Sequence, residues 1–159
     1  MYHPLWQKGS GHRTAGWCRE RHRIDECICG RTMVFDTEGC LRQIMAIRGA
    51  LGANLVDFTS GLSVGAAGRT PSEDHHVTAA GVSNVAHSAL STAAFVSTGQ
   101  VNHVDDIVVS AENGYHLIHF VGGRPHARMA LYVWLDRALG NLAMAQRHLR
   151  STAAELVAG

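Results

Sequence analysis

The dipeptide Asn113-Gly114 lies between two apolar runs and constrains the fold of this chain more than any other feature of its sequence. Residues 106–112 (DIVVSAE) precede it, and residues 115–121 (YHLIHFV) follow it. An Asn-Gly pair between two such runs is the strongest short-range signal for a β-hairpin. The segment therefore predicts two antiparallel strands joined by a tight turn.

Three further segments have the apolar pattern of strands. Residues 50–58 predict one strand, and residues 62–67 predict its antiparallel partner after a turn at residues 57–61. Residues 128–136 (RMALYVWLD) predict a fifth strand, which a turn at residues 122–125 separates from the hairpin. The chain is therefore expected to contain five strands.

Two of three predicted helices precede the hairpin. A short helix is expected from an N-cap at Thr37 to Gly49, with apolar residues at helical spacing between them. A long helix is expected to begin at residues 71–74, where Ser72 is the predicted cap, and to run to about Ser97. Both segments have the start and stop signals that helices require.

The third helix follows Gly140 and Asn141 and is predicted to be amphipathic. Arg147 and Arg150 lie off its apolar stripe. That stripe comprises Leu142, Ala145, Leu149, Ala153 and Leu156. The complete order, α-β-β-α-β-β-β-α, predicts an α+β fold around one antiparallel sheet, because hairpin-linked strands are flanked by helices.

The long predicted helix lies in a stretch of thirty residues, 75–104, without a single Asp, Glu, Lys or Arg. A surface helix usually carries charges on its solvent side, and charge is depleted at the centre of protein interfaces. The stripe expected to face the sheet comprises Val82, Val85, Ala86, Ala89, Leu90 and Ala93. The outer face comprises Ala80, Gly81, Asn84, His87, Ser88, Ser91 and Ala94. We expect this outer face to form a C2 dimer interface; the alternative is an ordinary helix with an uncharged solvent face.

Residues 1–32 differ in composition from residues 33–159. They contain six basic and three acidic residues, a net charge of +3, whereas the remainder has eight basic and ten acidic residues, a net charge of −2. They also hold three of the four cysteines and show no helical or strand periodicity. The expectation is a flexible basic leader before one domain; a start of translation at Met33 is the alternative.

The overall composition restricts the class of protein. The formal net charge of +1 speaks against a nucleic-acid-binding function driven by bulk charge. The chain has no apolar run long enough for a transmembrane helix, and its first residues lack the apolar core of a signal peptide. We therefore expect a cytoplasmic protein whose cysteines are reduced and which binds neither membrane nor nucleic acid.

One motif suggests catalysis. Residues 61–65 match the G-x-S-x-G pattern of a nucleophile elbow, and Asp105 or Asp106 with His116 would complete the order of a triad for Ser63. Such an elbow requires a strand that turns sharply into a helix, whereas this segment follows a hairpin turn and enters a strand. No catalytic residue is therefore predicted, and an esterase is kept only as an alternative.

Metal and cofactor sites are also not predicted. His116 and His119 are three residues apart in a strand and point to opposite faces. The best zinc candidates in the leader have a spacing that differs from that of the usual zinc knuckles. They are Cys18, His22, Cys27 and Cys29. The glycines at residues 61–68 lack the spacing of a dinucleotide-binding loop, so direct nucleotide binding is not expected.

Residues 35–157 resemble the Roadblock/LC7 domain, and more closely its stand-alone actinobacterial members. The resemblance lies in LVDFTSGL (residues 55–62), DDIVVSAENGYHLIHFVG (residues 105–122) and LYVWLDRALGNLAMAQRHL (residues 131–149). It implies a five-stranded sheet with the long helix on one face and the terminal helices on the other. It also implies homodimers whose long helices and third strands pair across the two-fold axis.

The same resemblance implies a non-catalytic partner, regulator or scaffold of a small Ras-like GTPase, encoded beside a sensor-kinase-like protein. Arg69, Arg124 and Arg128 lie in or beside predicted turns and are the candidate contacts with such a partner. The preferred mechanism is differential affinity for one nucleotide state of the GTPase rather than insertion of an arginine. The alternative is a dimeric adaptor without GTPase-directed activity, tethered to acidic partners by its basic leader.

Overall fold

The computed structural model describes residues 36–92, 104–122 and 128–158, all within one compact unit of residues 32–159. The predicted leader lies outside the described residues, as do the expected helix residues 93–97 and turn residues 123–125. Within the described part of the chain, no helix is long and apolar enough to cross a membrane.

The described residues form five strands in one antiparallel sheet, in the order β2-β1-β5-β4-β3. Three helices complete the domain. The elements are α1 Thr37–Met45, β1 Ala50–Asp57, β2 Leu62–Gly68, α2 His75–Ser91, β3 Asp106–Ala111, β4 Gly114–Phe120, β5 Met129–Leu135 and α3 Leu142–Ala158. This architecture confirms the predicted α+β fold and its order of elements.

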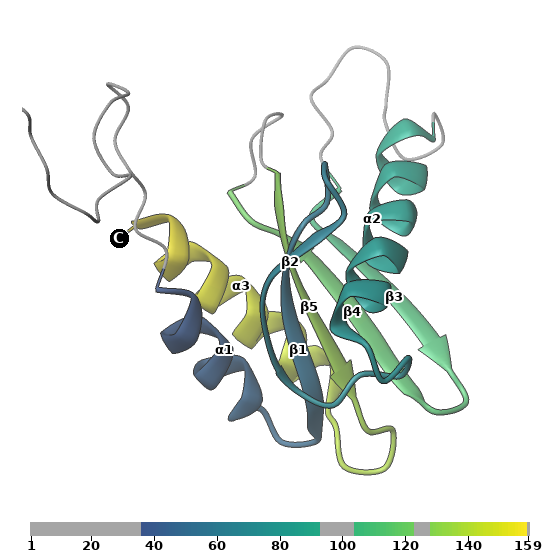
Figure 1. Ribbon diagram of the computed structural model, residues 1–159. Helices are drawn as coiled ribbons and strands as arrows, with labels where there is room; N and C mark the ends of the chain where they lie inside the picture. The colour runs from purple at the N-terminus through teal and green to yellow at the C-terminus, as the bar shows by residue number, and fades with distance from the viewer. Residues whose placement is uncertain (1–35, 93–103, 123–127, 159) are drawn as a thin grey trace, which may run out of the picture. The chain divides into compact units, whose positions relative to one another are not determined.

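The sheet separates two hydrophobic cores (Figure 1). Because side chains alternate along a strand, β5 directs Leu131, Val133 and Leu135 toward α1 and α3. It directs Ala130 and Tyr132 toward α2. The layering is therefore the predicted one, with the long helix on one face and the terminal helices on the other.

A buried amide fixes the start of α2 against the sheet. Asn54 of β1 is fully buried, and its side-chain NH₂ donates to the carbonyl oxygen of His75, the first residue of α2, at 3.0 Å. Its side-chain oxygen accepts a hydrogen bond of 2.7 Å from the Ser63 hydroxyl on β2. Since a buried amide without partners is costly, this pairing restricts where α2 can lie.

The predicted hairpin forms, with its turn one residue earlier than expected. Ala111 and Gly114 are already paired across β3 and β4, so the loop residues are Glu112 and Asn113. A Cβ atom on Gly114 would lie 2.4 Å from the carbonyl oxygen of Leu135 on β5. The glycine is thus required for close approach of the two strands rather than only for the turn.

Both predicted N-caps are wrong, each in favour of a neighbouring aspartate. Asp36 rather than Thr37 caps α1, because its carboxylate accepts from the Gly39 N–H at 2.9 Å. Asp74 rather than Ser72 caps α2, because it accepts from the N–H of the second helical residue at 2.7 Å. The Ser72 hydroxyl instead donates to the Asp74 carbonyl oxygen at 2.7 Å.

Two boundaries also differ from the predictions. The first helix ends at Met45, four residues before Gly49. The long helix ends at Ser91 rather than near Ser97, because Thr92 has extended backbone angles of φ −81° and ψ 116°. The hydroxyls of Ser91 and Thr92 donate to carbonyl oxygens of the preceding turn, and such bonds compete with continuation of a helix.

The inward face of α2 is rotated from the predicted stripe. The buried residues are Ala79, Val82, Ser83 and Ala86. Val85 and Leu90, which were expected to face the sheet, are 39% and 38% exposed. The buried residues are three or four positions apart and form one stripe, and Val85 lies beside that stripe. The prediction was therefore wrong for Val85 and Leu90.

Candidate interaction surface

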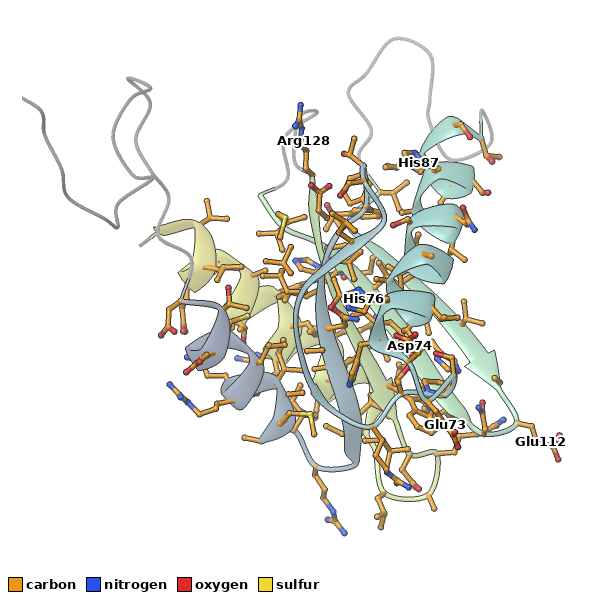
Figure 2. All side chains as sticks on the ribbon, in the orientation of Figure 1. Glu73, Asp74, His76, His87, Glu112 and Arg128 are labelled. Atoms are coloured by element: carbon orange, nitrogen blue, oxygen red, sulfur yellow. The ribbon has the colours of Figure 1, made fainter. Side chains whose placement is uncertain are left out.

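The outer face of α2 is exposed and uncharged. Its predicted interface residues within the described chain are all exposed: Ala80, Gly81, Asn84, His87, Ser88 and Ser91; Ala94 lies outside it. Val77, 58% exposed, and Val85 add apolar surface to this face. Figure 2 shows His76 and His87 near opposite ends of the helix. We give the name α2 outer face to eight exposed residues: Val77, Ala80, Gly81, Asn84, Val85, His87, Ser88 and Ser91.

No contact within the described protomer explains why residue 81 of this face is a glycine. A Cβ atom placed on it would meet nothing within 4 Å. Glycine inside a helix is about 1 kcal/mol less favourable than alanine. Because the described residues offer no steric reason for this glycine, its small size fits close approach by another backbone.

Strand β3 lies at the end of the sheet order and presents an uncharged edge. Val108 is 36% exposed and Val109 is 42% exposed. Sheet edges in monomers are usually protected by charges or prolines. The only acid on β3, Asp106, is instead directed inward and leaves the outer part of the strand uncharged.

Asp106 connects β3 to both β4 and α3. Its carboxylate contacts Nδ1 of His119 at 2.5 Å and accepts from Nε of Arg150 at 3.1 Å. The side chains of Asp106 and His119 are 11% and 12% exposed. This ionic contact joins the edge strand to the helical layer opposite α2, and it accounts for the one acidic side chain of the edge.

An aromatic row occupies the α2 side of the sheet. Nδ1 of His116 lies 2.8 Å from the Tyr132 hydroxyl, and the His116 ring stacks on Trp134 with 6.3 Å between centroids and 5° between planes. The Arg69 guanidinium carbon lies 6.0 Å from the Trp134 ring centroid. Burial lowers the pKa of His116 and raises that of Tyr132. Sequence reasoning missed this row, because its members come from three separate segments.

The candidate partner arginines do not form one group. Arg69 contacts Trp134 near the end of β5, whereas Arg128 immediately precedes the start of that strand. A strand of seven residues is about 20 Å long. Figure 2 shows Arg128 at the end of the sheet opposite Glu73 and Asp74. Arg124 lies outside the described residues.

The residues of the hypothetical triad are not brought together. Ser63 donates to Asn54, and Asp106 is bound to His119 and Arg150 on the α3 side of the sheet. His116 lies on the opposite face, with Tyr132. The G-x-S-x-G sequence therefore forms a turn and an edge strand here, with its serine in a structural hydrogen bond.

No three candidate metal ligands cluster within the described ranges. His116 and His119 point to opposite faces of the sheet, as their spacing predicted. The zinc candidates Cys18, His22, Cys27 and Cys29 lie outside the described residues. Cys40 is a free, buried thiol, and burial with the nearby Asp36 and Glu155 carboxylates raises its pKa to about 11.

Comparison with known proteins gives structural matches alone. No family model and no curated protein matches the chain. Myxococcus xanthus MglB superposes with a TM-score of 0.63 and 18% identity, covering 82% of this chain and 91% of MglB. A Roadblock/LC7 domain from Streptomyces avermitilis gives 0.58 and 18%, covering 76% and 90% of the two chains. The gliding protein MglB of Thermus thermophilus gives 0.52 and 19%, covering 74% and 88%.

Proposed function

This chain has the Roadblock/LC7 fold, and we propose that it acts as a homodimeric, non-catalytic regulator or scaffold of a small Ras-like GTPase. It acts in the cytoplasm without a cofactor or metal of its own. Its effect on the GTPase arises from unequal affinity for the GDP-bound and GTP-bound states. A sensor-kinase-like protein from the same operon is its second proposed partner.

The observation that supports the proposal is that one protomer exposes two uncharged surfaces, the α2 outer face and the β3 edge. Helix α2 has 17 residues and is therefore about 25 Å long. A stable dimer buries about 800 Å² on each partner. A helix face of this length together with a six-residue edge strand is of the size that such an interface requires.

A two-fold axis beside β3 would bury both surfaces in one dimer contact. The β3 edges would pair and extend the sheet across the axis, while the two α2 helices would pack against each other. Gly81 supports this arrangement, because its open surroundings admit the backbone of the second helix. The charge-free α2 outer face supports it too, because no ion would be buried in the contact.

Regulation by binding is favoured over catalysis by the surroundings of Ser63 and His116. The serine hydroxyl donates to an amide, and the imidazole lies on the same face beside a tyrosine hydroxyl. Among the described residues, neither side chain has the base or the orienting carboxylate that a hydrolase needs. Arg69 and Arg128 remain the proposed contacts with the GTPase in the described part of the chain.

The test is a titration with the purified small Ras-like GTPase encoded nearest to this chain's gene. The full chain is titrated with the GTPase loaded with GDP and, separately, with a non-hydrolysable GTP analogue, and hydrolysis of GTP is followed in parallel. Binding to one state at least tenfold more tightly than to the other is expected. Equal affinity for both states, with unchanged hydrolysis, would refute the regulatory proposal.

The basic leader favours a second candidate, a dimeric adaptor tethered to acidic partners. Its net charge of +3 contributes about 1 kcal/mol per basic residue near an anionic membrane surface. Binding of the full chain and of residues 33–159 to vesicles with and without phosphatidylserine separates the candidates. Loss of vesicle binding on truncation, with no GTPase binding by either chain, would favour the adaptor.

A further inference from the structure

One row of residues crosses all five strands on the α2 side of the sheet. Strand registers align Gly68, Gly52, Trp134, His116 and Val109 as successive neighbours from β2 to β3. We call these five residues, together with Arg69 above them, the Arg69 row.

Helix α2 begins beside the Arg69 row. The adjacent row contains Asn54, whose amide binds the carbonyl oxygen of His75, the first residue of the helix. The Arg69 row lies two residues further along each strand on the same face of the sheet, beyond this N-terminal anchor. The side chains of Trp134 and His116 are partly buried, and Nε1 of Trp134 is itself buried without a hydrogen-bond partner among the described residues.

Two glycines place Arg69 over this row. A Cβ atom on Gly52 would lie 1.6 Å from the carbonyl oxygen of Arg69, so the chain at Arg69 passes directly over β1. Gly68 has a φ of +73°, and a Cβ atom there would lie 2.6 Å from the carbonyl oxygen of Leu51. The Arg69 N–H donates to that same oxygen at 2.8 Å. A larger residue at either glycine would displace the arginine from Trp134.

Arg69 has no acidic partner among the described residues. The ion pairs found there involve Arg42, His119 and Arg150. A cation–π contact at this distance leaves the N–H groups of the guanidinium free to donate. Arg69 is thus an exposed cation over an aromatic ring, without a carboxylate partner in the described part of the chain.

Arg69 differs in this respect from the other arginines near the sheet. Arg137 also stacks on an aromatic ring, 5.3 Å from the Tyr115 centroid, but its guanidinium already donates to the Ala111 carbonyl oxygen at 3.2 Å. Arg128 has no aromatic neighbour among the described residues. Among the described arginines, only Arg69 both lies over an aromatic ring and has no described acceptor.

We propose that Arg69, held on Trp134, is the docking contact for an Asp or Glu side chain on the surface of the partner GTPase. The inference rests on the proposed function and specifies the chemistry of one of its contacts. A planar guanidinium binds a carboxylate through two parallel N–H···O bonds. The partly buried rings of Trp134 and His116 adjoin the guanidinium. The occupant is a partner carboxylate rather than a nucleotide phosphate, because the described residues around the row form no phosphate-binding loop.

The experiment compares Arg69→Met, Arg69→Lys and the wild-type chain in titrations with the same purified GTPase in its preferred nucleotide state. Methionine retains apolar cover over Trp134 but removes the charge, and lysine retains the charge but not the planar donor pair. Arg147→Met is the matched control, because Arg147 is exposed on α3 at the other face of the sheet.

We expect Arg69→Met to weaken binding about tenfold or more, Arg69→Lys to weaken it less, and Arg147→Met to leave it unchanged. The salt dependence of affinity should also be smaller for Arg69→Met, since an ion pair is lost. Size-exclusion chromatography with light scattering and thermal unfolding should give the same mass and midpoint for Arg69→Met and the wild type.

Three results would overturn the inference. Unchanged affinity of Arg69→Met would remove Arg69 from the contact while leaving the proposed function intact. Unchanged affinity with a large loss of GTP hydrolysis would show that the arginine acts on phosphate instead. Failure of the wild-type chain to bind the GTPase in either state would refute the proposed function and this inference together.

Discussion

Replacing Gly81 by glutamate is expected to dissociate the proposed homodimer without unfolding the protomer. The substitution places a charge at the centre of the α2 outer face, where the described protomer has open space within 4 Å of the new Cβ atom. In the free protomer this position is solvated, and glutamate is a better helix former than glycine by roughly 0.5–1 kcal/mol. Protomer stability should therefore stay the same or rise slightly.

The same substitution is expected to weaken the proposed dimer. Two-fold symmetry of the proposed dimer would bring both copies of the new carboxylate into one uncharged contact. Like charges that face each other in an interface cost several kcal/mol. A penalty of about 3 kcal/mol raises the dissociation constant of the dimer more than a hundredfold.

The assay is sedimentation velocity over a concentration series, combined with urea unfolding of the same samples. Ser151→Glu is the matched control, because Ser151 is exposed on α3, on the other side of the sheet. The control should sediment as the wild type does. A Gly81→Glu chain that dimerises with the wild-type dissociation constant would refute the assignment of the α2 outer face. So would a wild-type chain that is monomeric at all concentrations.

Three further predictions follow from buried groups. Asn54→Ala should lower the free energy of unfolding by about 2–4 kcal/mol in urea titrations, because two hydrogen-bonding partners lose the buried amide; a loss below about 0.5 kcal/mol would contradict the structure. Cys40, with its pKa raised from 9.0 to about 11, should react with iodoacetamide at pH 8 about a hundredfold more slowly than an unfolded thiol, measured by peptide mass spectrometry; equally fast labelling would disprove its burial. The pKa of His116 is lowered in the folded state, so its contribution to stability is present above its unfolded pKa of about 6.5 and is lost as pH falls through the folded value. Between pH 5 and about 7 the free energy of unfolding should therefore rise more steeply with pH in the wild type than in His116→Gln, and equal slopes would contradict this.

Local sequence patterns were sufficient for the elements and their order. The Asn113-Gly114 signal identified the β3–β4 hairpin, and the 3.6-residue period of the last helix identified its buried face, including Ala145 and Leu149. Both signals depend on neighbours within a few residues, so they can be read without knowing the rest of the fold. The charge-free outer face of α2 could be predicted for the same reason.

Contacts between segments distant in the sequence could be identified only from the tertiary structure. The packing of α2 against the sheet decided that Ser83 is buried and Val85 is exposed. Strand register brought Arg69 and Trp134 together across Gly52. Such contacts depend on strand order and register, which a linear pattern does not contain. The sequence by itself therefore determined which segments are strands and helices, and packing across the sheet decided which side chains form its surfaces.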